Sequence, residues 1–440
     1  MKKPAKPSAS GEKKEPLLVQ IEKPVYGGAF LARVEGRAVF TPLTLPGEEA
    51  RVRVVEEKRG YAVAEAEQIV KPSPERVVPC CRHFGACGGC DYQHTGYGAQ
   101  LRFKEAILRE TLERAGVPAP EEVSILAAEP WGYRNRIRLA FDAAGRAGYR
   151  GRRSHAVVPI EECPIAAPLL VKAALESERI LRESAPALKP TEISLFCDAD
   201  ETALLVGVSA RGGTRRGFEE FSLALSAEIP EVMGIELISE GPTGSQPRTL
   251  AQWGGSSLVY SVAGFGYRVG QGGFFQVNRR LVDALVERVT NGFSGVLAWD
   301  LFAGVGLFAR KLAESFGHVV AVESAQAAVQ ALQENLKGTN ARAVRASTLD
   351  FLRLARKKEC AELIIVDPPR TGLGAETTAI LAEIAAPALV CVSCDPATLA
   401  RDLRALISVT GSGYAIESLT LADLFPQTFH LETVVHLRRR

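Results

Sequence analysis

Apolar and polar residues alternate in short runs between residues 17 and 72. These runs are rich in β-branched residues and are separated by turns that contain glycine, a pattern typical of strands. They read LLVQIEK, RVEGRAVFTP, EARVRVVEEK and YAVAEAEQIV. About four or five short strands joined by tight turns predict a small barrel of the OB type. Residues 1–16 are rich in Lys, Pro and Ser without apolar periodicity, so we expect a disordered basic tail there.

Helical spacing first appears between residues 96 and 116. Its apolar positions are Leu101, Ile107, Leu108 and Leu112, and Gly116 is a typical helix end. Strand-like and helix-like segments then mix up to residue 263, with an Ala- and Leu-rich helix expected over residues 169–182. We therefore predict an α+β central domain over residues 79–263.

From residue 264 onward, β-rich runs alternate with amphipathic segments. This alternation predicts a parallel, doubly wound sheet over residues 264–440. The expected strands include Ala341–Arg345, Ala388–Val392 and a late strand over Phe429–Leu437. Open sheets of this kind bind ligands at the carboxyl ends of their strands, so the residues that follow each strand are the candidates for chemistry.

Two of these strand ends favour a nucleoside ligand. In GVLAWDLFAGVG, Gly304 and Gly306 lack Cβ atoms, which lets the backbone approach a ligand before a helix that begins near Leu307. The fingerprint G-x-G-x-x-G is absent, so this turn alone is a weak signal. The next strand, HVVAVES, ends at Glu323, where an acid can accept both hydroxyls of a ribose. The alternative for Glu323 is an ordinary acid at a helix N-terminus.

The strand over Ala388–Val392 delivers Cys394 to a turn closed by Pro396, and helical spacing begins at Thr398. The thiol therefore lies at a strand end, where ligands bind. The alternative is that Cys394 is a small core residue, as most single cysteines are. We interpret Asp395 as the cap of the following helix.

Composition sets the class of protein. A chain of 440 residues has room for about three domains, and its 46% hydrophobic and 24% charged residues are ordinary for a globular protein. The sequence has neither an apolar run of membrane-span length nor a secretory signal, so we expect a cytoplasmic protein without a membrane partner. Thiols stay reduced in the cytoplasm. The nine cysteines of the chain therefore suggest metal binding or catalysis before disulfides.

A cysteine cluster lies in CCRHFGACGGCDYQH. Cys81, Cys87 and Cys90 have the spacing C-x5-C-x2-C, and the glycines before Cys90 let the sulfurs converge. Such a cluster in a reducing compartment favours metal ligation over core packing. Cys163 is the expected fourth donor, and Cys80 is the alternative. All-thiolate sites suit both Zn²⁺ and iron–sulfur clusters, so the spacing leaves the metal open.

Basic residues gather between residues 134 and 153, where seven arginines face one acid, Asp142. The arginines are Arg134, Arg136, Arg138, Arg146, Arg150, Arg152 and Arg153. Trp131, Tyr133 and Tyr149 lie among them. A solvated basic face is the plain interpretation, but the aromatic residues favour a surface that pairs phosphates and stacks bases.

Several motifs together resemble the uracil-C5 RNA methyltransferases, which make 5-methyluridine in tRNA and ribosomal RNA. DLFAGVGLF resembles the glycine turn of enzymes that use S-adenosylmethionine, IIVDPPRTGL resembles a substrate loop, and VSCDPATLARDL carries the cysteine. Residues 275–278 match the motif F-x-Q-x-N, and residues 430–434 match H-x-E-x-V. The resemblance runs from about residue 17 to the end. It implies a Rossmann-like methyltransferase domain at 264–440 and a TRAM domain at 17–72.

The resemblance also implies roles for individual residues. Cys394 would attack C6 of uracil, and Glu432 would remove the proton from C5. A buried acid such as Glu432 is costly in an apolar strand unless it is used or paired. The implied cofactor-binding residues are Gln276, Phe302, Gly304, Leu307, Glu323, Ser347 and Asp367. The implied ligands of a 4Fe–4S cluster, favoured over zinc, are Cys81, Cys87, Cys90 and Cys163.

The cluster and the small barrel resemble the enzymes of ribosomal RNA, of the 23S rRNA type, more than the minimal tRNA enzyme. We expect a monomer. One alternative is a tRNA uridine as substrate, and another is a non-catalytic RNA-binding or assembly protein. An adenine or amino methyltransferase is a third alternative, but DPPR here replaces the aromatic residue of its motif, and its mechanism leaves Cys394 idle.

Overall fold

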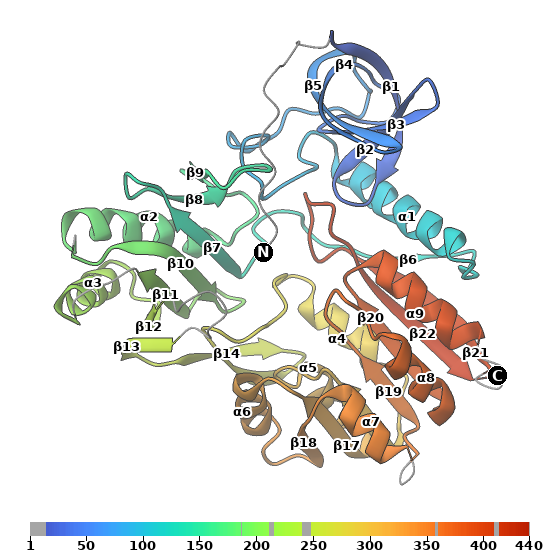
Figure 1. The fold of residues 1–440 in the computed structure, drawn as a ribbon. Coiled ribbons are helices and arrows are strands. Elements are labelled where there is room, and N and C mark those ends of the chain that lie inside the picture. The colour runs from blue at the N-terminus through green and yellow to red at the C-terminus, as the bar shows by residue number, and fades with distance from the viewer. Residues whose placement is uncertain are drawn as a thin grey trace, which may run out of the picture.

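The computed structural model describes residues 15–185, 187–210, 215–239, 248–356, 360–408 and 413–439. Its strands form a small barrel, a central sheet, a short hairpin and a large C-terminal sheet (Figure 1). The disordered tail that we expect before residue 17 lies almost entirely outside the described residues. No helix in the described ranges is both long and apolar enough to cross a membrane.

The N-terminal strands close into a barrel in the order β1-β2-β3-β5-β4, which confirms the predicted OB-like module. Its strands are β1 (Leu17–Val25), β2 (Ala29–Val34), β3 (Arg37–Pro42), β4 (Glu49–Lys58) and β5 (Tyr61–Lys71). Helix α1 (Tyr97–Arg114) packs against the barrel, because its Ala99 and Phe103 belong to the same apolar core as Phe30. The other side of α1 contacts helix α9 (Pro396–Ser408) of the C-terminal domain.

The central domain is a sheet in the order β13-β12-β11-β10-β7-β8-β9. Its strands are β7 (Arg136–Phe141), β8 (Ala147–Arg150), β9 (Val157–Pro159), β10 (Pro190–Cys197), β11 (Leu204–Ala210), β12 (Val232–Ser239) and β13 (Arg248–Gly254). Helices α2 (Pro168–Glu183) and α3 (Arg215–Glu228) cover it and bury Leu170 and Phe221 in its core. The hairpin of β14 (Ser257–Val262) and β15 (Phe265–Gly270) leads into the next domain.

The C-terminal sheet has the order β18-β17-β16-β19-β20-β22-β21-β6. Its strands are β16 (Gly295–Leu301), β17 (Phe316–Glu323), β18 (Ala341–Arg345), β19 (Leu363–Val366), β20 (Ala388–Ser393), β21 (Tyr414–Ala422) and β22 (Glu432–Arg439). A short strand that precedes the central sheet in the chain, β6 (Ser124–Leu126), pairs instead with the edge strand β21 of the C-terminal sheet. Strands β16 to β20 run parallel, and β22 is antiparallel to β20.

Helices cover both faces of this sheet, as the predicted doubly wound fold requires. Helices α4 (Val282–Thr290), α5 (Leu307–Leu312) and α6 (Gln326–Asn335) pack on one face, and α7 (Thr348–Ala355), α8 (Ala375–Ile384) and α9 (Pro396–Ser408) pack on the other. The parallel strands β19 and β20 are fully buried, which explains their continuous apolar runs.

Two element boundaries differ from expectation. The late strand begins at Glu432 rather than at Phe429, so the three residues before Glu432 form a loop. Helix α9 begins at Pro396 rather than at Thr398, because proline is well suited to the first turn of a helix, where its missing N–H is not needed. The first change matters for function because it moves Glu432 from the middle of a strand to its end.

Candidate active site and cysteine-lined cavity

Cys394 lies in the turn between β20 and α9, half-buried. Asp395 fixes this turn, because its Oδ1 accepts hydrogen bonds from the backbone N–H groups of Ala397 at 3.0 Å and Thr398 at 2.9 Å. It is therefore the cap of α9. Burial and, to a smaller extent, the nearby Glu432 carboxylate raise the pKa of the Cys394 thiol to about 11, against the lowering effect of Arg370.

Glu432 is the first residue of β22, the strand next to β20. Thr433 pairs with Ser393 in the antiparallel register, so Cys394 and Glu432 lie at the same ends of adjacent strands. The Glu432 side chain is buried. Burial raises its pKa well above the ordinary value for glutamate, and the neighbouring carboxylate of Asp367 raises it further. A carboxyl group with a raised pKa is a stronger proton acceptor than an ordinary surface glutamate.

Asp367 and Arg370 join this group from the loop after β19. Burial raises the pKa of Asp367 to about 7. The Arg370 guanidinium donates to Nδ1 of His430 at 3.2 Å, and burial together with Arg370 lowers the pKa of His430 to about 4. His430 is therefore neutral at physiological pH and leaves the positive charge of Arg370 to act on Cys394 and Glu432.

The glycine turn lies between β16 and α5. Gly304 and Gly306 have positive φ angles of 56° and 90°, and a Cβ on Gly306 would lie 2.7 Å from Cδ1 of Leu332. Phe302, with φ of 66°, adopts the same left-handed region, which is strained for a side chain of its size. Glu323 at the end of β17 holds the turn, because its Oε2 accepts from the Gly304 N–H at 3.0 Å. The acid thus orders the loop.

The remaining predicted cofactor residues occupy different surroundings. Gln276 is buried, and its backbone oxygen accepts from Nδ2 of Asn135 at 2.9 Å. Ser347 caps α7 by accepting from the Asp350 N–H at 3.1 Å. The Leu307 side chain packs into the core beneath the sheet, which leaves only its backbone for a ligand. The cofactor roles of these residues stay predictions.

Asp300 is a residue at this site that sequence reasoning did not single out. It lies in β16, is fully buried, and accepts the Ala309 N–H through Oδ2 at 2.9 Å. Its Oδ1 has no partner among the described residues, and burial raises its pKa to about 8. The sequence feature that could have identified Asp300 is an acid at the end of an apolar strand, just before a glycine turn.

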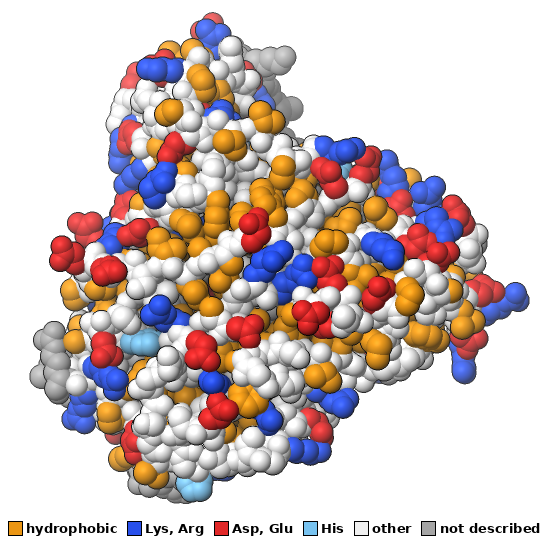
Figure 2. Space-filling model, turned by 180° about the vertical axis from the view of Figure 1, so that it is seen from behind, with side chains coloured by type: hydrophobic (Ala, Val, Ile, Leu, Met, Phe, Trp, Pro, Cys, Tyr) orange, Lys and Arg blue, Asp and Glu red, His pale blue; other side chains and the backbone are white. Residues whose placement is uncertain are grey.

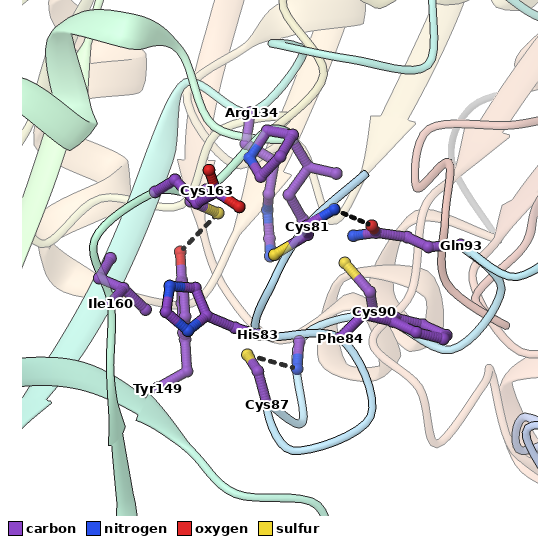
Figure 3. Close-up of a pocket in the computed structure, with 14 residues that line it drawn as sticks. Cys81, His83, Phe84, Cys87, Cys90, Gln93, Arg134, Tyr149, Ile160 and Cys163 are labelled. Atoms are coloured by element: carbon purple, nitrogen blue, oxygen red, sulfur yellow. Dashed lines mark hydrogen bonds between the residues drawn. The ribbon is translucent and has the colours of Figure 1, made fainter. Parts of the chain in front are cut away.

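A second site is a small cavity of about 20 Å³ that is lined by Cys81, Cys87, Cys90 and Cys163. Figure 3 shows three of these cysteines on one loop and Cys163 approaching from the opposite side. The Tyr149 hydroxyl lies 3.7 Å from Cys163 Sγ. Cys80 is exposed and lies outside the lining. Among the described residues, no three His, Cys, Asp or Glu side chains are arranged as the ligands of a metal ion.

Comparisons with known proteins identify the family. Residues 257–440 match the tRNA (uracil-5-)-methyltransferase model, and residues 13–66 match the TRAM domain. A 23S rRNA (uracil(1939)-C(5))-methyltransferase of Alkalilimnicola ehrlichii is 32% identical over 97% of this chain and 97% of its own length. The chain belongs to the RNA uracil-5-methyltransferase family. This confirms both the resemblance read from the motifs and the enzyme class.

Other similar proteins cover the chain equally well. An uncharacterized RNA methyltransferase of Streptomyces avermitilis is 35% identical over 95% of this chain and 97% of its own length. The crystal structure of a Pyrococcus abyssi tRNA (uracil-54, C5)-methyltransferase in complex with S-adenosyl-L-homocysteine matches with a TM-score of 0.76 and 25% identity. That match covers 95% of this chain and 99% of the other. The whole architecture, barrel included, is therefore that of the family.

The basic segment over residues 134–153 is exposed only in part, and its role in pairing phosphates stays a prediction. Tyr133 is fully buried and donates to the Pro426 carbonyl at 3.0 Å, so it is not available to stack a base. Arg136 packs 4.0 Å from the centroid of Phe196, and Arg152 pairs with Asp91 at 3.1 Å. Charges of both signs are interspersed over the molecular face in Figure 2. Arg138, Arg146, Arg150 and Arg153 are exposed, whereas Arg134, Arg136 and Arg152 are partly covered by their neighbours.

Proposed function

We propose that this protein transfers a methyl group from S-adenosylmethionine to C5 of a uridine in 23S ribosomal RNA. The observation that carries the proposal is the placement of Cys394 and Glu432 at the same ends of β20 and β22, beside Asp367 and Arg370. A thiol and a basic carboxyl group on neighbouring strand ends are what C5 methylation needs, because C5 of uracil is by itself a poor nucleophile.

Cys394 acts as the nucleophile in this proposal. Its thiolate forms a bond to C6, the C5–C6 double bond opens, and the electron pair moves into the C4 carbonyl as an enolate. The high pKa of the thiol means that it needs help to ionise, and the Arg370 guanidinium supplies a favourable field. A desolvated thiolate is also a stronger nucleophile once it has formed.

Glu432 acts as the general base. After C5 has been methylated, it takes the H5 proton, the C5–C6 double bond forms again, and the bond to Cys394 breaks with return of the thiolate. Burial and Asp367 keep the pKa of Glu432 high, which matches a group that must accept a proton from carbon. Asp367 and Arg370 have opposite effects on Glu432 and so tune its basicity.

S-adenosylmethionine, when bound, supplies an electrophilic methyl group. The residues proposed to hold it are Gln276, Phe302, Gly304, Leu307, Glu323, Ser347 and Asp367. The left-handed backbone at Phe302 and Gly304 supports this assignment, because strained turns of this kind cluster at ligand sites. Glu323 already orders the turn by accepting the Gly304 N–H, and its other oxygen accepts from the Ser324 and Ala325 N–H groups at 2.7 Å.

A 4Fe–4S cluster on Cys81, Cys87, Cys90 and Cys163 is part of the proposal. The donor set fits, since four thiols line one cavity beside the buried Tyr133 and Ile165. Each thiolate of such a cluster binds a different iron, so the sulfurs stand farther apart than the ligands of a single Zn²⁺ ion. The resemblance of the cysteine spacing to that of cluster-bearing members of the family is what favours a cluster over zinc. Its role would be to tie the cysteine loop to the central domain.

RNA has a candidate path beside the barrel. A cleft of about 260 Å³ separates the barrel turn at Gly27 from the hairpin of β8 and β9, and Arg150, Arg152 and Arg153 line it. Cationic side chains in such a cleft bind phosphates by displacing counterions. Each proposed site is built within one chain, so we propose a monomer that acts in the cytoplasm, where ribosomal RNA is modified.

The substrate is the part of the proposal that an experiment must decide. A relative that modifies 23S rRNA supports ribosomal RNA, whereas the Pyrococcus abyssi structure keeps a tRNA uridine as the second candidate. Purified protein should incorporate label from methyl-labelled S-adenosylmethionine into unmodified 23S rRNA, and mapping of 5-methyluridine should locate one position. Label in tRNA alone would show that the substrate is tRNA and not 23S rRNA. No label in either RNA would favour a non-catalytic role.

A further inference from the structure

Tyr26 of the barrel reaches the active-site turn. It lies in the turn between β1 and β2, and its hydroxyl donates to the backbone carbonyl of Cys394 at 3.3 Å, across 368 positions of sequence. The contact joins the small N-terminal module to the residue proposed as nucleophile. In Figure 1 the barrel lies at one end of α1, next to the C-terminal loop that precedes β22.

The barrel turn is packed tightly against that loop. The Tyr26 ring meets the Phe429 ring edge-on, with 5.4 Å between the centroids and 88° between the planes. Gly28, at φ of 81°, approaches so closely that a Cβ would lie 2.9 Å from Asp91 Oδ1 and 3.1 Å from Phe429 Cδ1. A glycine is required at this point because any side chain would push the barrel turn away.

The surroundings of the Tyr26 hydroxyl keep it protonated. Burial and the negative charge of Asp395 raise its pKa to about 12, against a lowering effect of Arg370 and with smaller raising effects from Cys394 and Glu432. The phenol is therefore a permanent donor over the physiological range. These groups also show that Tyr26 lies among the reacting side chains and not at the outer rim of the barrel.

Contacts outside the turn hold the barrel in place. Lys23 of β1 donates to Glu110 of α1 at 2.7 Å, and Phe30 meets Phe103 of α1 with 5.6 Å between ring centroids. Helix α1 in turn packs on α9, the helix that begins directly after Cys394. The position of the Tyr26 hydroxyl is thus set by rigid elements on both sides.

We infer that Tyr26 is a positioning residue for the reaction, which makes the barrel part of the catalytic machinery in addition to any role in RNA binding. The inference rests on the proposed function. By holding the carbonyl of Cys394, Tyr26 fixes the peptide plane of the turn and hence the direction in which the thiol leaves the backbone. Small errors in the position of a reacting atom slow catalysis strongly.

The test compares two tyrosines in the intact protein, purified without oxygen. Tyr26→Phe removes the hydroxyl and keeps the ring on Phe429. Tyr414→Phe is the matched control, because the Tyr414 hydroxyl also donates to a backbone carbonyl, that of Ala386 at 2.9 Å. Tyr414 lies at the start of β21, whereas the other end of that strand, Ala422, pairs with Glu432.

Two readouts are expected to separate the variants. With RNA that carries 5-fluorouridine, Tyr26→Phe should form the covalent adduct about tenfold more slowly at saturating RNA, the effect of losing one hydrogen bond, while the Kd for RNA stays unchanged. Amide hydrogen exchange in the free protein should be faster for residues 394–398 in Tyr26→Phe. Tyr414→Phe should match the unmutated protein in both readouts.

Each outcome decides the inference. A Tyr26→Phe variant with unchanged exchange at residues 394–398 overturns it, whatever the activity. Weaker RNA binding with an unchanged adduct rate at saturation assigns Tyr26 to binding and also overturns it. If exchange changes as expected but the unmutated protein forms no adduct, the positioning contact stands and the proposed function fails.

Discussion

The Thr433 hydroxyl donates to the carbonyl oxygen of Ser393, its register partner across β20 and β22, at 3.1 Å. This bond links the two residues that immediately flank Cys394 and Glu432. The site therefore depends on the register of the antiparallel pair that joins the five parallel strands β16 to β20 to the rest of the sheet. A slip of one residue would turn Glu432 to the opposite face of the sheet and away from the thiol.

The charge of Arg370 should control the ionisation of Cys394. Arg370→Met removes the positive charge that lowers the pKa of the thiol, so that pKa should move above its present value of about 11. Alkylation of Cys394 by iodoacetamide, followed by peptide mass spectrometry, should be slower at every pH below that value. Arg370→Lys keeps the charge and should resemble the unmutated protein. Equal alkylation rates in Arg370→Met would show that the guanidinium does not act on the thiol.

A buried ion pair should hold the loop that precedes Glu432. Lys104 of α1 donates to Asp423 Oδ1 at 2.6 Å and to the Phe425 carbonyl at 3.0 Å, with both charged side chains fully buried. Lys104→Met should reduce the free energy of unfolding by about 3–5 kcal/mol, since it leaves Asp423 charged and unpaired. Urea unfolding followed by circular dichroism measures this change.

Two variants calibrate that measurement. Lys104→Met with Asp423→Leu removes both charges and should recover much of the loss. Lys23→Met breaks the partly exposed pair with Glu110 and should cost less than about 1 kcal/mol. If Lys104→Met is no more harmful than Lys23→Met, the buried pair does not secure the loop.

The four cysteines of the cavity should be needed to hold iron, whereas Cys80 should not be. Protein purified without oxygen should be brown and contain iron and acid-labile sulfide, and serine at Cys81, Cys87, Cys90 or Cys163 should remove both. Cys80→Ser is the matched control and should keep the colour, because Cys80 lies outside the cavity. Stoichiometric zinc without iron would contradict the cluster while leaving a ligated site.

Much of the catalytic domain could be predicted from local pattern. Strand Ala341–Arg345 and the turn that carries Cys394 follow from β-branched runs, glycines and a proline, all of which act within a few residues. The start of β22 was misplaced because Phe429 to Leu431 are as apolar as the strand itself. Only tertiary contacts, such as Phe429 against Tyr26, show that they form a loop.

Other features lie beyond any local pattern. Tyr26 and Cys394 are brought together by the docking of one domain on another, which no spacing encodes. Tyr133 was expected to stack a base for a related reason, since its partner, the Pro426 carbonyl, is far along the chain and no local pattern reveals its burial. The charge of a residue can be read from a sequence, but its exposure is decided by what packs against it.

The central claim is that Cys394 forms a covalent adduct and Glu432 resolves it. The most direct measurement is denaturing gel electrophoresis of each variant after incubation with S-adenosylmethionine and labelled target RNA. Glu432→Gln should attack and methylate but fail to remove the C5 proton, and so hold methylated RNA in a band that survives denaturation. Cys394→Ala should bind the RNA and give no such band. Normal turnover by Glu432→Gln, or methylation by Cys394→Ala, would contradict the account.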